Sequence, residues 1–412
     1  MSFAWEEHVD PLFDDSPAYA AIIDAFDRSP VAGEHLNVFV GYGTVGFQEN
    51  ARGFVIDFLR GLLRADDALP FSGEELLAEC ERFWSSFQER SVELTMLAPC
   101  WGFELPPSGV DMGEGCRLER VSRRLRRELG AADVHAVDWT SDPPTAAFVY
   151  RERVEKTFGK EVWDKRGTKI VEWTRRGAEA IQAASEGLSL FKNGSFERGR
   201  WVTAAGAHGR SRSYERGTNW GVRDSFRKPS YRIKDETEAA ELERLRGVLL
   251  GLTPAAARHL RVPLRRFHLA TVRHDVADAF IDLLIAVEAL VSDDTEKSEL
   301  NYRVAQRMAL LVGKSPTERR EIAKQMKAAY DVRSRLVHGR DLEKVVKVGG
   351  RKVPPSAFLD EVREIVRRAI LAGVESAANQ PNGSSLFDWD SMIFGQPEPE
   401  GGSNAPPTPE ST

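Results

Sequence analysis

The sequence of 412 residues is short of cysteine, has no long apolar run and carries no excess of positive charge. Cys80, Cys100 and Cys116 form no CxxC pair and no disulfide-like framework, which favours a reducing compartment over a secreted fate. No apolar run approaches the length of about 18 residues that a transmembrane helix needs, so we expect none. The net charge of −6 excludes a globally basic protein, and any contact with nucleic acid must therefore be local.

Targeting signals and metal-binding patterns are also missing. Residues 1–8 carry acids where a secretory signal peptide needs basic residues. The histidines are scattered singly, without the spacing of metal ligands. We therefore expect a cytoplasmic protein with no membrane association, no metal and no cofactor.

Residues 1–195 predict an α+β domain, which we expect to act as a sensor or regulator. Apolar residues recur at helical spacing over residues 19–26 and 53–63. From Ser91 onward, short alternating runs between Gly and Pro predict strands instead. These runs are residues 92–97, 101–105, 116–121 and 146–150.

A glycine-rich stretch at residues 41–46 reads Gly-Tyr-Gly-Thr-Val-Gly, which matches the GxGxxG pattern of dinucleotide-binding folds. That fold requires a second strand ending in an acid about 20 residues later. Residues 58–67 instead continue a helical pattern. We therefore favour a glycine-rich turn and keep nucleotide binding as the alternative.

Residues 196–236 form a basic, aromatic linker. Between residues 198 and 232 there are nine Lys or Arg against two acids, with five aromatic residues among them. Cations that pair with phosphates beside rings that stack on bases suit single-stranded nucleic acid. The candidate RNA-binding residues are Arg210, Arg212, Arg216 and Trp220. The favoured alternative is a solvated loop whose aromatic residues anchor it to its own domain.

Residues 237–378 predict an all-α domain. After an amphipathic helix over residues 239–252, apolar faces at helical spacing predict a four-helix bundle over residues 273–378. Its helices are expected at residues 274–291, 298–313, 316–339 and 357–378, with a loop at 345–355. In the tail, residues 379–412, we expect disorder except for an apolar island at 386–394 that docks on the bundle.

Three blocks of the bundle occur in a fixed order, at residues 282–290, 298–307 and 330–339. They resemble the HEPN superfamily and, within it, the Apea-like HEPN group, over about a quarter of the chain. The resemblance implies a bundle that pairs with itself and carries an Arg-x4-His signature, here Arg333 and His338. In active relatives this signature cleaves RNA without a metal, often as a toxin or antiphage effector. The residue after the arginine is commonly a polar one such as Asn, and here it is Ser334.

The residue types suit that chemistry. An imidazole that titrates near neutrality can take the 2′-OH proton or protonate the leaving oxygen. A guanidinium can hold the crowded phosphate of the transition state. Five residues turn an ideal helix by roughly 500°, so Arg333 and His338 lie roughly 140° apart. Either the helix loosens at its end, or the arginine's length bridges the gap, or two protomers form the site. Arg335 shares the face of His338 and is a second phosphate contact.

The leading hypothesis is a dimeric, metal-independent endoribonuclease, or an RNA-targeting effector in antiphage defence or abortive infection. The structural alternative is that Arg333 pairs with an acid such as Glu288, while His338 caps the helix. The chain would then be a catalytically inactive HEPN module that binds nucleic acid or a protein partner. An open basic cleft around Arg333 favours the first hypothesis, and an ion pair with Glu288 favours the second.

Overall fold

The computed structural model divides the chain into two compact units, Met1–Leu250 (unit 1) and Gly251–Thr412 (unit 2). No helix in the part of the chain described is both long enough and apolar enough to cross a membrane. The residues that the structure describes are 17–28, 39–42, 45–48, 81, 85, 91–122, 125, 144–155, 168–199, 201–205, 230–292, 300–379 and 386–394.

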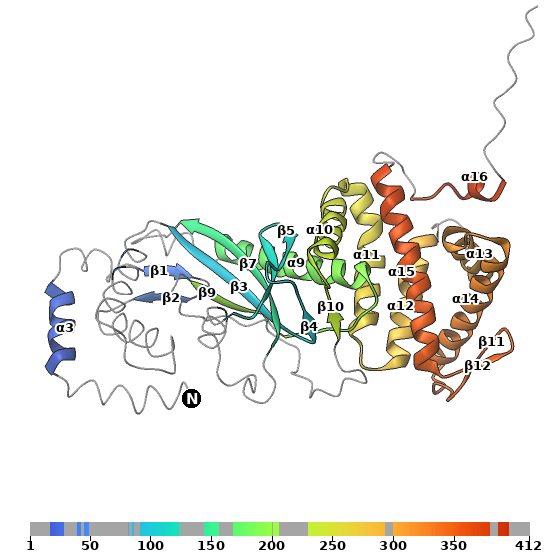
Figure 1. Cartoon of the computed structure of the whole chain (residues 1–412), viewed down its shortest axis with the longest axis horizontal. Helices are drawn as coiled ribbons and strands as arrows, with labels where there is room; N and C mark the ends of the chain where they lie inside the picture. The colour runs from blue at the N-terminus through green and yellow to red at the C-terminus, as the bar shows by residue number, and fades with distance from the viewer. Residues whose placement is uncertain are drawn as a thin grey trace, which may run out of the picture. The chain divides into compact units, whose positions relative to one another are not determined.

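Unit 1 is built on an antiparallel sheet whose two long strands are β3 (Ser91–Trp101) and β7 (Ala146–Glu155) (Figure 1). Their register runs from Ser91 opposite Glu155 to Cys100 opposite Ala146. The strand order is β5-β6-β7-β3-β8, with β9 also pairing with β3. The strands predicted from Ser91 onward are confirmed. The shorter strands are β5 (Val110–Gly113), β6 (Cys116–Arg120), β8 (Glu197–Arg198) and β9 (Val202–Ala205).

The two faces of this sheet belong to different clusters, as the alternation of side chains along a strand requires. Met96 and Phe148 pack in the main core with Ile181 of α9 (Thr168–Phe191), a long helix that the sequence patterns did not predict. The next residues along the strands, Leu97 and Val149, pack in a smaller cluster on the other face. Unit 1 also contains α3 (Pro17–Arg28), which confirms the helix predicted at residues 19–26.

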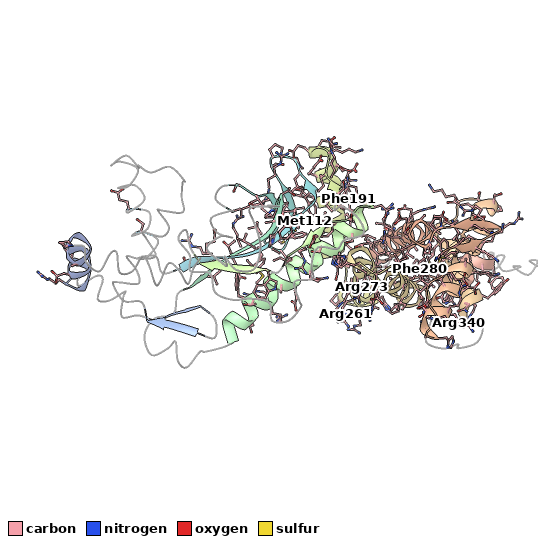
Figure 2. The ribbon with its side chains drawn as sticks, turned by 90° about the horizontal axis from the view of Figure 1, so that it is seen from below. Met112, Phe191, Arg261, Arg273, Phe280 and Arg340 are labelled. Atoms are coloured by element: carbon pink, nitrogen blue, oxygen red, sulfur yellow. The ribbon has the colours of Figure 1, made fainter. Side chains whose placement is uncertain are left out.

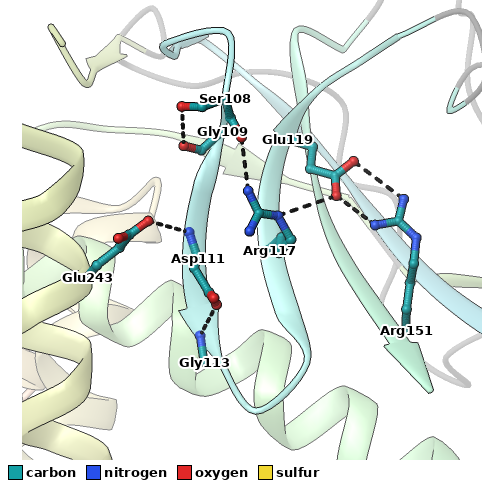
Figure 3. Close-up of polar contacts among 8 residues, drawn as sticks. All are labelled: Ser108, Gly109, Asp111, Gly113, Arg117, Glu119, Arg151 and Glu243. Carbon is teal, nitrogen blue, oxygen red and sulfur yellow. Dashed lines mark hydrogen bonds and ion pairs between the residues drawn. The ribbon is translucent and has the colours of Figure 1, made fainter. Parts of the chain in front are cut away.

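The helix α10 (Glu236–Leu250) belongs to unit 1, whereas the sequence predicted that the helical domain begins at residue 237. The reason is Arg246, which is only 4% exposed. Its Nε donates to the Met112 carbonyl and its Nη1 to the Ala183 carbonyl, each at 3.0 Å. Glu243 in addition accepts a hydrogen bond from the Asp111 N–H at 2.9 Å (Figure 3). These bonds join α10 to β5 and α9.

Both ends of the predicted basic linker are part of the core of unit 1. Phe196, Trp201 and Tyr231 are 5%, 7% and 1% exposed. The Tyr231 hydroxyl donates to the Leu188 carbonyl at 2.6 Å. Two-residue strands β4 (Phe103–Glu104) and β10 (Tyr231–Arg232) pair in parallel. The interpretation of the outer aromatic residues as anchors is therefore confirmed. Arg210, Arg212, Arg216 and Trp220 lie outside the described residues.

The GxGxxG stretch lies in a hairpin. β1 (Phe39–Tyr42) pairs antiparallel with β2 (Val45–Gln48), so that Gly41 is opposite Gly46. A dinucleotide fold needs this glycine pattern between a strand and a helix. Gly43 and Thr44 lie outside the described residues, but the β1–β2 pairing does not match that strand-then-helix arrangement and supports the glycine-rich turn.

Unit 2 is mainly helical, and the four helices predicted for its bundle are present. α11 is an addition to them: no helix was predicted at its position. Unit 2 is also not all-α, because the predicted loop contains a hairpin of β11 (Val346–Val348) and β12 (Arg351–Val353). The helices are α11 (Pro254–Val272), α12 (Val276–Val291), α13 (Leu300–Val312), α14 (Pro316–Val337), α15 (Pro355–Asn379) and α16 (Trp389–Phe394).

The core of unit 2 draws one large buried side chain or more from each of α11–α15. Phe280 of α12, labelled in Figure 2, packs against Phe358 of α15 with the two rings tilted and their centroids 5.7 Å apart. One acid of α12, Asp282, is also buried, with a side chain that is 3% exposed. Arg266 Nη1 lies 2.7 Å from Asp282 Oδ1, and Arg273 Nε lies 3.0 Å from Oδ2. A buried carboxylate requires such partners.

The apolar island of the tail docks on unit 2, as predicted. Leu386, Phe387 and Trp389 are buried. The Ser376 hydroxyl donates to the Leu386 carbonyl at 2.6 Å, and the Arg307 guanidinium lies 4.7 Å from the Trp389 ring centroid. This contact holds α16 against α13.

Candidate functional site

The signature residues lie at the C-terminal end of α14, and the local sequence explains why this helix forms. Ser315 is the N-cap and accepts a hydrogen bond from the Glu318 N–H at 3.2 Å. Pro316 follows at the first helical position, where its missing N–H costs nothing. One face then enters the core through Ile322, Met326, Ala329 and Tyr330. The helix is thereby fixed beside α12, which carries Glu288.

The end of α14 is set by His338 and Gly339. His338 is the C-cap residue, with φ −86° and ψ 17°. Gly339 has φ 75°, and its N–H donates to the Leu336 carbonyl at 3.0 Å. The Arg340 N–H donates to the Arg335 carbonyl, also at 3.0 Å. These two bonds make a Schellman motif, which favours glycine at the left-handed position. The helix is therefore regular until His338, which is exposed.

Arg333 forms an ion pair with Glu288. Its Nη1 lies 3.1 Å from Glu288 Oε1, and its Nη2 donates to Oε2 at 3.1 Å. The two side chains are 29% and 22% exposed. The Tyr330 hydroxyl lies 3.4 Å from Glu288 Oε1, and burial together with the carboxylate raises the pKa of Tyr330. Arg333 Nε is buried and has no hydrogen-bond partner in the part of the chain described. The predicted alternative, an Arg333–Glu288 pair, is confirmed.

Arg335 is also paired. Its Nη1 contacts Glu343, and its Nε donates to the Asp331 carbonyl at 3.2 Å. The sequence did not predict Glu343 as a partner, because this acid follows the end of the helix. Ser334 is exposed and contributes its carbonyl, which accepts from the His338 N–H at 3.1 Å.

Arg333 and His338 are not brought together within one chain. Among the described residues, no hydrogen bond or ion pair joins their side chains. The helix does not loosen before His338, so the roughly 140° between the two positions remains. The guanidinium also points to an acid of α12 and not along its own helix. Of the three arrangements that the spacing allows, a site shared by two protomers remains a prediction.

The sequence did not predict the cations that follow this helix end along the chain. Residues 340–352 contain five Lys or Arg against two acids. Lys347 and Lys352 lie directly opposite each other in the β11–β12 hairpin, and both are exposed. Like charges at such a position destabilise a hairpin. Arg340 and Lys344 are exposed as well. The alternation of Val346 and Val348 before Gly-Gly was the available signal for this hairpin.

The described residues do not form a metal site. In the described ranges, no three or more His, Cys, Asp or Glu side chains are grouped so that they could hold a metal ion. Cys100 and Cys116 are buried in unit 1, where burial raises the pKa of each thiol to about 12. Both therefore remain protonated and suit neither nucleophilic attack nor metal binding.

Comparison of this chain with protein-family models, with curated proteins and with solved structures finds no match.

Proposed function

We propose that α12–α15 form a HEPN-like four-helix bundle, and that unit 2 binds RNA without cutting it in the conformation described. The three sequence blocks that resemble the HEPN superfamily fall on α12, α13 and α14. The signature itself ends α14. The exposed cations that follow that helix end along the chain, Arg340, Lys344, Lys347 and Lys352, supply positive charge that suits phosphates.

The observation that decides between binding and cleavage is the Arg333–Glu288 pair. A catalytic arginine has to meet the charge that develops on the phosphate in the transition state. Arg333 directs both terminal nitrogens to Glu288, each 3.1 Å from a carboxylate oxygen. A phosphate that used the same two N–H groups would have to displace that carboxylate. Hydrogen bonds to charged groups are worth about 1.5–3 kcal/mol each, so the displacement opposes cleavage.

One observation favours cleavage as a second function. His338 is exposed at the helix end, and no side-chain hydrogen bond to it is found in the described part of the chain. A second protomer could therefore place an arginine beside it. This dimeric, metal-independent endoribonuclease would fit an antiphage effector whose unit 1 senses the trigger.

The test is incubation of purified full-length protein with total RNA in EDTA, alongside binding of a labelled single-stranded RNA. We expect binding without EDTA-resistant cleavage, and no effect of His338→Ala on either result. Cleavage that His338→Ala lowers by about 10²–10⁴-fold would establish the second function instead. If the wild type neither binds nor cleaves RNA, both functions are wrong.

The variant Glu288→Gln distinguishes an inactive binding module from an active site that the Arg333–Glu288 ion pair suppresses. If the ion pair suppresses an active site, Glu288→Gln cleaves RNA although the wild type does not. Adding Arg333→Lys should then abolish that cleavage, because lysine keeps the charge but lacks the planar fork. If Glu288→Gln remains inactive while still binding RNA, the binding function stands.

A further inference from the structure

The helix α11 is unusual in a chain whose net charge is −6. Its sequence, PAAARHLRVPLRRFHLATV, contains four arginines and two histidines but no acid. It was not predicted as a separate helix, because its basic residues and the internal Pro263 obscure the pattern. Thr253 caps it by accepting from the Ala256 N–H at 3.3 Å.

Three of its arginines form one exposed stripe. Arg258, Arg261 and Arg265 are all exposed and, at about 100° per residue, lie within roughly 60° of one another around the helix. The main buried face is opposite to them and consists of Ala256, Leu260, Pro263, Phe267 and Ala270. His268 is also buried and lies nearer to Arg261 around the helix. We call Arg258, Arg261 and Arg265 the arginine stripe.

The charges of the stripe are not neutralised, unlike those of several other arginines of unit 2. Arg335 pairs with Glu343, and Arg351 with Glu361. Within the described residues, no ion pair or hydrogen bond is found for the stripe side chains. Farther along the same helix, Arg266 and Arg273 share the single charge of Asp282, which leaves one positive charge unmatched. In Figure 2, Arg261 and Arg273 lie toward the same side of unit 2.

We infer that the arginine stripe binds the phosphate backbone of single-stranded RNA, an inference that rests on the RNA-binding function proposed above. The planar fork of arginine matches a phosphate in two hydrogen bonds. The stripe spans about 10 Å along the helix at about 1.5 Å per residue. A stacked strand advances about 3.4 Å per phosphate, so roughly one phosphate is available for each arginine.

An acidic protein fits this surface less well. Stable protein interfaces are anchored by buried aromatic or aliphatic side chains at their centre. Beside the stripe, the exposed large apolar residue of α11 is Val262, at 41% exposure. A phosphate backbone needs no such anchor, because counterion release drives its binding.

The test replaces Arg258, Arg261 and Arg265 by Ala in the full-length protein and measures affinity for a labelled 20-nucleotide uridine RNA across salt concentrations. Each lost phosphate contact lowers the salt slope of a single strand by about 0.7, so three should lower it by about 2. Between 50 and 200 mM salt, the wild type should then lose roughly 20-fold more affinity than the variant. Alanine favours helix, so α11 should keep its fold.

The matched control replaces Arg28, Arg175 and Arg176 by Ala. These arginines are exposed too, but each is paired with an acid of unit 1. The change in net charge is the same, so an equal loss of slope in both variants would show a general charge effect and overturn the inference. If the wild type binds RNA and the stripe variant has the same salt slope, this inference is wrong while the proposed RNA-binding function stands.

A wild type that binds no RNA would overturn the proposed function together with the stripe. Polyglutamate is the probe for an acidic partner. If the stripe variant loses polyglutamate binding but retains RNA binding, the surface serves an acidic protein and the inference is wrong.

Discussion

The two units bury charge in opposite ways. Unit 1 buries a cation, Arg246, whose Nε and Nη1 donate to main-chain carbonyls, and no carboxylate in the part of unit 1 that is described forms an ion pair with it. Unit 2 buries an anion, Asp282, and neutralises it with two arginines whose side chains are 39% and 44% exposed. In unit 1 the charge and its partner Met112 are buried, whereas in unit 2 the two partner side chains reach solvent.

This difference predicts how each unit tolerates change. Burial lowers the pKa of Arg246, and its Nη2 is buried without a hydrogen-bond partner in the part described. We therefore expect no neighbouring side chain to replace the Arg246 guanidinium when it is removed. When Asp282 is removed, the side chains of Arg266 and Arg273 can become solvated instead. Water stabilises an exposed charge well, so the loss of an exposed partner costs little free energy. A ligand can also exchange with the partner of a partly exposed arginine, as in unit 2. It cannot reach a buried arginine such as Arg246.

The largest effect is expected for Arg246→Ala. The variant leaves the Met112 and Ala183 carbonyls without their donor and opens a cavity between α9 and α10. Each unsatisfied buried carbonyl costs about 1–3 kcal/mol, and relief of the buried charge offsets part of this. We expect unit 1 to lose about 3 kcal/mol of unfolding free energy, measured by urea denaturation with hydrogen exchange in each unit.

Two comparisons sharpen that result. Arg246→Met fills the space but leaves the carbonyls bare, and should cost about half as much. Arg175→Ala removes an exposed arginine of the same unit and should cost less than about 1 kcal/mol. Equal losses for Arg246→Ala and Arg175→Ala would show that the enclosed cation does not stabilise unit 1.

A smaller effect is expected for Asp282→Asn in unit 2. Removing one member of a fully buried ion pair costs about 3–5 kcal/mol. Here Arg266 and Arg273 can be solvated, so we expect about 2 kcal/mol or less, seen as a lower urea midpoint of unit 2. The control is Asp278→Asn, an exposed acid in the first turn of the same helix. A loss for Asp282→Asn larger than that for Arg246→Ala would reverse the comparison between the units.

The helices α12–α15 of unit 2 could be predicted because each carries large apolar residues at helical spacing. α9 could not, because its packing face depends on small residues. Gly187 lets Arg246 approach, since a Cβ there would lie 2.5 Å from Arg246 Cδ. Gly177 likewise allows Met96 and Tyr150 to contact the helix. Glycine lowers helix propensity, so the residues that make the packing possible also hide the helix.

The candidate site could be predicted in part. The end of α14 at His338-Gly339 follows from the glycine, and the sequence alone indicates Glu288 as a candidate partner of Arg333. The Glu343 partner of Arg335 and the opposed lysines Lys347 and Lys352 depend on a chain reversal after the helix. The acid and the hairpin lie close to α14 only in three dimensions, and helical periodicity carries no information about them.

The smallest effect is expected at a helix start and depends on pH. Glu318 accepts a hydrogen bond from the Lys314 N–H at 2.9 Å, and Arg368 Nη2 lies 2.9 Å from its other oxygen. These contacts hold the pKa of Glu318 below its usual value. A glutamate whose pKa is lower in the folded protein than in the unfolded chain stabilises the fold at any pH above its unfolded pKa of about 4.3. This contribution is lost as the pH falls through the folded pKa.

We therefore expect Glu318→Gln to lower the urea midpoint of unit 2 at pH 7, and the difference from the wild type to shrink below about pH 4. Glu375→Gln is the control, because this exposed acid of α15 has no ion pair within the described residues, and its variant should show no such convergence.

Unit 1 supplies a second comparison in Glu238, which contacts Lys192 and the Lys234 N–H at the start of α10. Burial alone would raise the pKa of Glu238, but these contacts lower it overall. A difference between wild type and Glu318→Gln that stays constant from pH 7 to 3 would show that the ionised carboxylate does not stabilise α14.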